Sequence, residues 1–135
     1  MQAIVADHFQ QYREQCHFAV STETCTAILT RNPHRHPDIQ ICPAGRDPDQ
    51  LPWVVIEILS KADRLLAQLN RYREYWQLGV THTVLLYPEE ELAFRFEDGS
   101  LIQSRFSSLE LPTGSVPFDT DALFRQLSDE RNTSS

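Results

Sequence analysis

The chain has 135 residues, which is the length of one ordinary domain. Apolar residues make up 41% and charged residues 23%, a composition that excludes a wholly disordered chain, a collagen and a disulfide-rich miniprotein. The net charge of −7 at pH 7 opposes nucleic-acid binding over the surface as a whole, so a nucleic-acid activity requires a local basic patch.

The sequence shows no signal for secretion or for a membrane. The N-terminus lacks a basic region followed by a long apolar segment, and no stretch approaches the roughly 20 apolar residues of a membrane span. The cysteines (Cys16, Cys25 and Cys42) are odd in number and lack Cys-x-x-Cys spacing. We therefore expect reduced thiols in a cytoplasmic protein without a membrane partner.

The first half of the chain predicts one helix followed by strands. Apolar residues at helical spacing predict the helix near Gln2–Glu14. The predicted strands are His17–Ser21, Thr26–Thr30, Asp38–Cys42 and Pro52–Leu59. The last of these is rich in valine and isoleucine, which is typical of a central strand covered on both faces.

The second half predicts a long helix, a hairpin and a closing helix. The long helix begins after Ser60, an N-cap residue, and ends at Gly79. The remaining elements are strands at Thr83–Tyr87, Leu92–Phe96 and Leu101–Arg105 and a helix at Asp121–Ser128. Asp98-Gly99 is a hairpin turn signal. This order predicts a mixed α/β fold (α+β) with a mixed central sheet flanked by helices, a single domain over residues 1–130 and a flexible tail over 131–135.

Two acidic residues stand out against this background. Glu57 interrupts the apolar run Trp53–Leu59, and a buried carboxylate needs a cation, an arginine or a proton. Asp38 follows Pro37 at the start of another predicted strand. Each residue alone fits a structural salt bridge or a turn. Together, on adjacent strands, they are oxygen ligands of the kind that bind Mg²⁺ or Mn²⁺.

At these residues the sequence resembles the PD-(D/E)XK nuclease superfamily, and more closely its Uma-type family of restriction-endonuclease-like proteins. The residues that carry the resemblance are Pro37-Asp38, Val55-Ile56-Glu57-Ile58-Leu59-Ser60, Tyr75, Gly79-Val80 and Leu85-Leu86-Tyr87-Pro88. The resemblance implies a restriction-endonuclease-like core and a metal held by Asp38, Glu57 and the main-chain carbonyl of Ile58.

The chain departs from the pattern it resembles at four positions. The superfamily's lysine two residues after the Glu falls on Leu59, and its place on the following helix in Uma-type proteins falls on Arg71. The family's helix aspartate falls on Ala67, and its aspartate before Pro88 falls on Tyr87. The chain therefore keeps the two carboxylates of the pattern and replaces its lysine.

The long helix has a predicted core face bordered by a basic stripe. Helical spacing places Leu65, Leu69, Tyr72 and Trp76 on the core face, with Ala62 beside them. The bordering residues are Lys61, Arg64, Gln68, Arg71 and Tyr75. This stripe is either an ordinary solvated flank or a surface that contacts phosphate and stabilises transition-state charge.

Other candidate residues carry weaker patterns. His34 and His36 alternate with Asp38, which fits either an irregular loop or a zinc site. Glu14 is either a solvated helix residue or an additional acid. Cys25 has no visible base partner, which argues against a Cys–His hydrolase.

These patterns favour a Mg²⁺- or Mn²⁺-dependent endonuclease that hydrolyses DNA phosphodiester bonds. Asp38 and Glu57 bind the metal, and Arg71, Tyr75 and Lys61 stabilise the developing charge. By resemblance, pairing into a homodimer is plausible.

Two alternatives stay open. One is a non-catalytic nucleic-acid-binding or regulatory protein on the same fold, because the usual lysine is replaced. The other is a protein–protein module that uses the hairpin around Asp98-Gly99.

Overall fold

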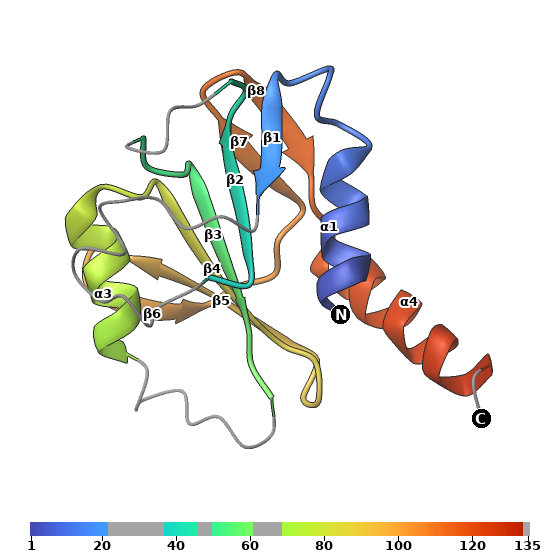
Figure 1. Ribbon diagram of the computed structural model, residues 1–135. Coiled ribbons are helices and arrows are strands. Elements are labelled where there is room, and N and C mark those ends of the chain that lie inside the picture. Colours follow the sequence, from blue (N-terminus) through green and yellow to red (C-terminus); the bar gives the residue numbers. More distant parts are fainter. Residues whose placement is uncertain (22–36, 46–49, 61–68, 134–135) are drawn as a thin grey trace.

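The computed structural model describes residues 1–21, 37–45, 50–60 and 69–133. Six of the described strands form one mixed sheet in the order β1-β2-β3-β4-β5-β6 (Figure 1). Their bounds are Phe18–Ser21, Ile39–Pro43, Val54–Ile58, His82–Tyr87, Leu92–Glu97 and Ser100–Gln103. Neighbours pair antiparallel, except that β3 and β4 are parallel.

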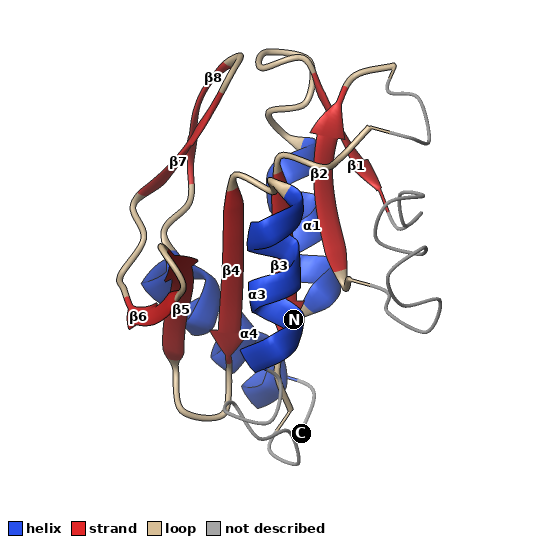
Figure 2. Cartoon of the chain, turned by 90° about the vertical axis from the view of Figure 1, so that its left-hand side faces the viewer, coloured by secondary structure: helices blue, strands red, loops and turns tan. Residues whose placement is uncertain are grey.

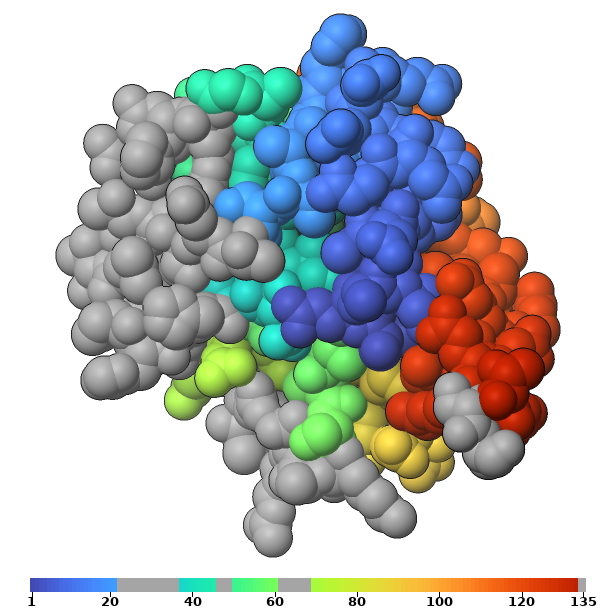
Figure 3. Space-filling model, turned by 45° about the vertical axis from the view of Figure 1, so that its right-hand side comes forward, coloured from blue at the N-terminus to red at the C-terminus, as the bar shows by residue number. Residues whose placement is uncertain are grey.

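Helices cover both faces of this sheet. Helix α3 (Leu69–Leu78) lies on one face, and α1 (Gln2–Gln10) and α4 (Thr120–Thr133) lie on the other (Figure 2). Figure 3 shows α1 and α4 next to each other at the surface. The predicted mixed α/β fold, with a mixed sheet flanked by helices, is therefore confirmed.

The face toward α1 and α4 is apolar and holds the largest core cluster. Alternate residues of a strand point to opposite faces, so Val54 and Ile56 of β3 face α1 while Val55 and Glu57 face α3. The sheet contributes Ile39, Ile41, Val54, Ile56, Val84, Leu86 and Ala93 to this cluster. The opposite face is mixed, because Gln40, Glu57 and Thr83 are buried there among apolar residues.

Local signals predicted two chain reversals correctly. Gly79 ends α3 with φ +101°, and the Val80 N–H donates to the Tyr75 carbonyl at 3.1 Å, a helix end that favours glycine. Asp98 and Gly99 have φ values of 50° and 81° in the turn between β5 and β6. Both conformations follow from residues that tolerate positive φ.

Several predicted boundaries differ from the structure. α1 ends at Gln10 instead of Glu14, because the chain turns to bury Cys16 and to bond the Phe18 N–H to the Arg13 carbonyl at 3.1 Å. α4 extends to Thr133, beyond the predicted end at Ser128. The predicted strand Thr26–Thr30 and the predicted helix residues 61–68 lie outside the described residues.

The hairpin formed by β7 (Ser108–Leu111) and β8 (Gly114–Pro117) was not predicted from the sequence. Its strands alternate exposed and buried residues, and Leu109 and Val116 pack into the main core. The sequence carries the signal for this hairpin, because the alternating Ser-Leu-Glu-Leu precedes the turn residues Pro-Thr-Gly. The signal is short, since each strand has only four residues.

Cys16 and Cys42 are buried and are not in a disulfide, and Cys25 lies outside the described residues. None of the helices in the described part of the chain combines the length and apolar character needed to cross a bilayer.

Phe118 joins the hairpin to the core and provides a test of this packing. The residue is fully buried, and its ring centroid lies 5.3 Å from that of Phe9 and 5.5 Å from that of Phe106. We expect Phe118→Ala to lower the free energy of unfolding by about 3–5 kcal/mol, measured by urea denaturation. The exposed Ile102→Ala should change it by about 0.5 kcal/mol or less. Equal effects of the two substitutions would contradict this packing.

Candidate active site

Strand register brings Asp38, the residue before β2, opposite Glu57 of β3. At this end of the two antiparallel strands, the last paired residues are Ile39 and Ile56. Asp38 directly precedes Ile39, and Glu57 directly follows Ile56. Extending the register by one step places the two acids across from each other, where side chains share one face.

The Asp38 carboxylate is tied to the backbone next to Glu57. Its Oδ2 accepts a hydrogen bond from the Ile58 N–H at 2.7 Å. The Gln2 side chain of α1 donates to the Asp38 main-chain carbonyl at 2.9 Å, which fixes this end of β2 from the other side. Asp38 itself is half-buried, and its Oδ1 makes no hydrogen bond to the described residues. One carboxylate oxygen is therefore structural and the other is available to a ligand.

Glu57 is a buried acid with two identified partners on α3. The residue is 3% exposed. The Tyr75 hydroxyl donates to Oε1 at 2.9 Å, and the Arg71 Nη1 lies 3.9 Å from Oε2. A hydrogen bond and a nearby cation offset the cost of burying the charge.

One face of α3 delivers both partners. Arg71 and Tyr75 are four residues apart, so their side chains lie on the same face of the helix. Tyr75 is fully buried, whereas the Arg71 side chain is 33% exposed. The helix therefore presents a phenol to the inner part of Glu57 and a guanidinium nearer to solvent.

The predicted core face of this helix was wrong in part. Tyr72 is fully buried, as expected, but Trp76 is 42% exposed, and Tyr75 takes the second fully buried position. The helix is thus rotated so that the Tyr75 hydroxyl reaches Glu57. Trp76 lies at the edge, with its ring centroid 6.3 Å from that of Phe96.

The position of the superfamily lysine is apolar in the structure as well as in the sequence. Leu59 is 4% exposed and packs in a cluster with Tyr72, Leu85 and Phe96. Lys61, Arg64 and Ala67 lie outside the described residues. In the described part of the chain, the cation beside Glu57 is therefore Arg71.

Of the weaker candidates, the structure describes Glu14, and Glu14 is not brought into this site. Glu14 is exposed in the turn that leads to β1, where Phe18 pairs with Pro43 at the end of β2 away from Asp38. Glu14 and Asp38 therefore lie at opposite ends of β2. This location is wrong for an additional acid beside Asp38. His34 and His36 lie outside the described residues.

Two buried polar residues on the same sheet face were missed. Gln40 and Thr83 are 0% and 3% exposed. Gln40 lies two residues after Asp38 in β2, so strand alternation places it on the face of Asp38, and this signal was available in the sequence. Thr83 pairs in register with Val55, two residues before Glu57.

The described residues offer an oxygen-rich donor set. They contain no group of three or more His, Cys, Asp or Glu side chains arranged to hold a metal. Asp38, Glu57 and the main-chain carbonyl of Ile58 remain as oxygen donors at the end of β3. Hard divalent cations such as Mg²⁺ take few protein oxygens and keep several waters, so this small set fits their chemistry.

Comparisons with known proteins find likeness in structure rather than in sequence. No model of a known protein family matches the chain, and no curated protein matches it. Among solved structures, it is similar to the crystal structure of a "putative nuclease belonging to DUF820" from Anabaena variabilis ATCC 29413. The TM-score is 0.66, with 16% identity over 93% of this chain and 79% of that chain. This likeness shows that the two chains share a fold.

The hydrogen bond from Tyr75 to Glu57 provides a stability test. Tyr75→Phe keeps the buried ring and removes the hydroxyl that donates to a buried carboxylate. We therefore expect the free energy of unfolding, measured by urea denaturation, to fall by about 1–3 kcal/mol. The matched control is Tyr12→Phe, a half-buried tyrosine of the opposite face. In the double variant with Glu57→Gln, the loss from Tyr75→Phe should shrink, because a neutral amide is less costly to bury. Strict additivity would contradict a coupled pair.

Proposed function

We propose that the chain is a metal-dependent nuclease of the PD-(D/E)XK type, related to the Uma-type family, that hydrolyses phosphodiester bonds in DNA. The observation that carries the proposal is the hydrogen bond from the Ile58 N–H to the Asp38 carboxylate. This hydrogen bond holds Asp38 next to Ile58, the residue that directly follows Glu57. The similarity in fold to the DUF820 protein supports the nuclease activity in general terms.

Asp38, Glu57 and the Ile58 carbonyl are the residues that would hold Mg²⁺ or Mn²⁺. When bound, such an ion polarises the phosphate and lowers the pKa of a bound water. Among the described residues the site carries two acids and one cation, Arg71, and this excess of acidic groups favours a divalent cation.

Residues of α3 supply the other functions. The Arg71 guanidinium stays protonated, which makes it a poor base and a suitable group for stabilising negative charge on a phosphate. Its partial exposure, 33% of the side chain, leaves it accessible to a substrate. The Tyr75 hydroxyl orients Glu57 through Oε1. Lys61 follows β3 by three residues and is a further candidate cation.

A second candidate function is that of a non-catalytic protein with the same fold. The buried Leu59 at the position of the superfamily lysine favours a nucleic-acid-binding or regulatory protein. Within this alternative, the net charge of −7 favours the regulatory role over tight binding to DNA.

Isosteric variants test catalysis without removing the hydrogen bonds. In Asp38→Asn the amide oxygen still accepts from Ile58, and in Glu57→Gln it still accepts from Tyr75. We expect the wild-type protein to nick supercoiled plasmid DNA in Mn²⁺ and both variants to lose about 100-fold or more in rate, a loss typical of removing catalytic charge. The control is Asp7→Asn, an exposed acid of α1. Cleavage that survives in both variants would overturn the proposal.

A thermal-shift measurement separates the two functions. If the site binds metal, Mn²⁺ should raise the melting temperature of the wild-type protein and of Asp7→Asn, but not that of Glu57→Gln. DNA binding without a metal-dependent shift, measured by fluorescence anisotropy, would favour the non-catalytic protein.

A further inference from the structure

β6 is the end strand of the six-stranded sheet, and its outer edge has no strand partner in the described part of the chain. The next strands along the chain, β7 and β8, form a separate two-stranded sheet. His82 Nε2 of β4 donates to the main-chain oxygen of Glu110 in β7 at 2.7 Å. The hairpin therefore lies against β4 instead of continuing the sheet beyond β6.

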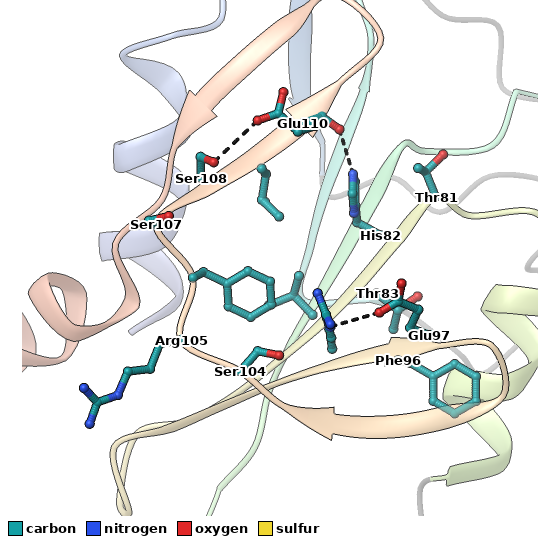
Figure 4. Close-up of a pocket in the computed structure, with 14 residues that line it drawn as sticks. Thr81, His82, Thr83, Phe96, Glu97, Ser104, Arg105, Ser107, Ser108 and Glu110 are labelled. Carbon is teal, nitrogen blue, oxygen red and sulfur yellow. Dashed lines mark hydrogen bonds and ion pairs between the residues drawn. The ribbon is translucent and has the colours of Figure 1, made fainter.

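A cavity of about 470 Å³ lies between this hairpin and the sheet (Figure 4). Val84 and Arg95, which pair across β4 and β5, line it from the face that packs on α1 and α4. The segment that leads from β6 into β7 forms another wall, and Figure 4 shows the Arg105 side chain pointing away from the cavity. The cavity therefore lies on a face of the sheet, and the edge of β6 is a separate surface.

β6 carries none of the features that usually protect a sheet edge from other strands. Such features are lysine, proline, an inward-pointing charge or a β-bulge. The strand reads Ser-Leu-Ile-Gln, and it pairs with β5 in unbroken register over Ser100–Gln103. Its residues are exposed except for the half-buried Leu101. An exposed and uncharged edge of this kind favours pairing with another strand.

The main-chain groups that point outward from β6 follow from its pairing with β5. The Ser104 N–H donates to the Ala93 carbonyl at 2.9 Å. Alternate residues of an antiparallel strand bond to the same neighbour, so Ile102 also turns its N–H and C=O toward β5. Leu101 and Gln103 turn theirs toward the open edge.

Ile102 lacks apolar cover from the described residues. It is 36% exposed, and it and Trp76 are the two large apolar residues exposed in that part of the chain. Leu101 packs against the core cluster under α3, whereas Ile102 packs against none of the clusters that the described residues form. Its neighbour on β5 is Arg95, which is paired with Glu97 at 3.0 Å. An apolar side chain on an open strand edge indicates a contact surface.

We propose that two copies of the chain pair through β6 as antiparallel strands, with Ile102 at the two-fold axis. In this register Leu101 of one copy lies opposite Gln103 of the other, so the outward main-chain groups of both residues form hydrogen bonds. Ile102 then faces Ile102 of the second copy at a non-hydrogen-bonded position, where Cα atoms are about 4.5 Å apart. A single register thus satisfies the outward backbone groups and covers the exposed isoleucine.

The charges beside the edge favour a second copy of the same chain as the partner. Arg95 is paired with Glu97, and the Arg105 Nη1 lies 3.9 Å from Asp121 Oδ2. Asp98 precedes β6 and Arg105 follows it, so antiparallel pairing brings the acidic end of one strand to the basic end of the other. The net charge of −7 opposes association over longer distances, where salt screens it.

The two-fold axis of such a pair is perpendicular to the sheet, so both copies keep α3 and Glu57 on the same side of the joined sheet. This presents both candidate sites to one DNA molecule, a consequence that rests on the proposed function. The pairing itself does not, because β4 and β5 separate β6 from β3. Glu57→Gln should therefore associate as the wild-type protein does.

Sedimentation velocity of the full chain tests the inference. One short strand from each copy is less than the interface of a permanent dimer, so we expect reversible association with a Kd on the order of 10–100 μM. Ile102→Glu and Ile102→Lys each place like charges opposite each other, and each variant alone should associate at least about tenfold more weakly. An equal mixture of the two variants should restore association, because opposite charges then face each other.

The matched controls are Gln11→Glu and Gln11→Lys, which add the same charges at an exposed residue after α1 and should associate as the wild type does. In dilute solution the Ile102 variants should unfold in urea as the wild type does, which excludes misfolding as the cause of weaker association. A wild-type chain that stays monomeric over this concentration range would overturn the inference. So would association that Ile102→Glu leaves unchanged, equal weakening by Gln11→Glu, or a mixture that stays monomeric. Loss of association in Glu57→Gln would instead place the contact at the carboxylate site.

Discussion

The burial of one carboxylate constrains the structure around the candidate site. β3 is covered on both faces, so Glu57 is removed from water except for 3% of its surface. An ionised acid in such a place requires donors or cations within reach. Tyr75 and Arg71 meet this requirement from a single helix, and that fixes how α3 lies on the sheet. The exposure of Trp76 is a consequence of the same rotation.

The elements that the sequence predicted correctly depend on local chemistry. Val54–Ile58 is a strand because its β-branched residues fit a buried pleated surface, and Glu57 stands out in it for the same reason. The Asp98-Gly99 turn and the Gly79 helix end need positive φ, which few residues adopt easily. The position of Asp38 and Glu57 on neighbouring strands was also predictable, since both strands carried clear signals.

The features that the sequence did not predict depend on tertiary contacts. Helical spacing alone ranked Trp76 above Tyr75 as a core residue, because a wheel does not include the polar requirement of a residue on another strand. The β7–β8 hairpin gains its stability from Leu109 and Val116 in the main core rather than from strand propensity. The cavity at Arg95 exists only because that hairpin stands beside β4 and β5.

Electrostatics connects the proposed metal site to the composition of the chain. A protein with net charge −7 gains little from general attraction to phosphate, so each anion site must be built locally. At Glu57 the described groups are two acids and one arginine, and a phosphate is repelled unless a divalent cation changes the sign of the site.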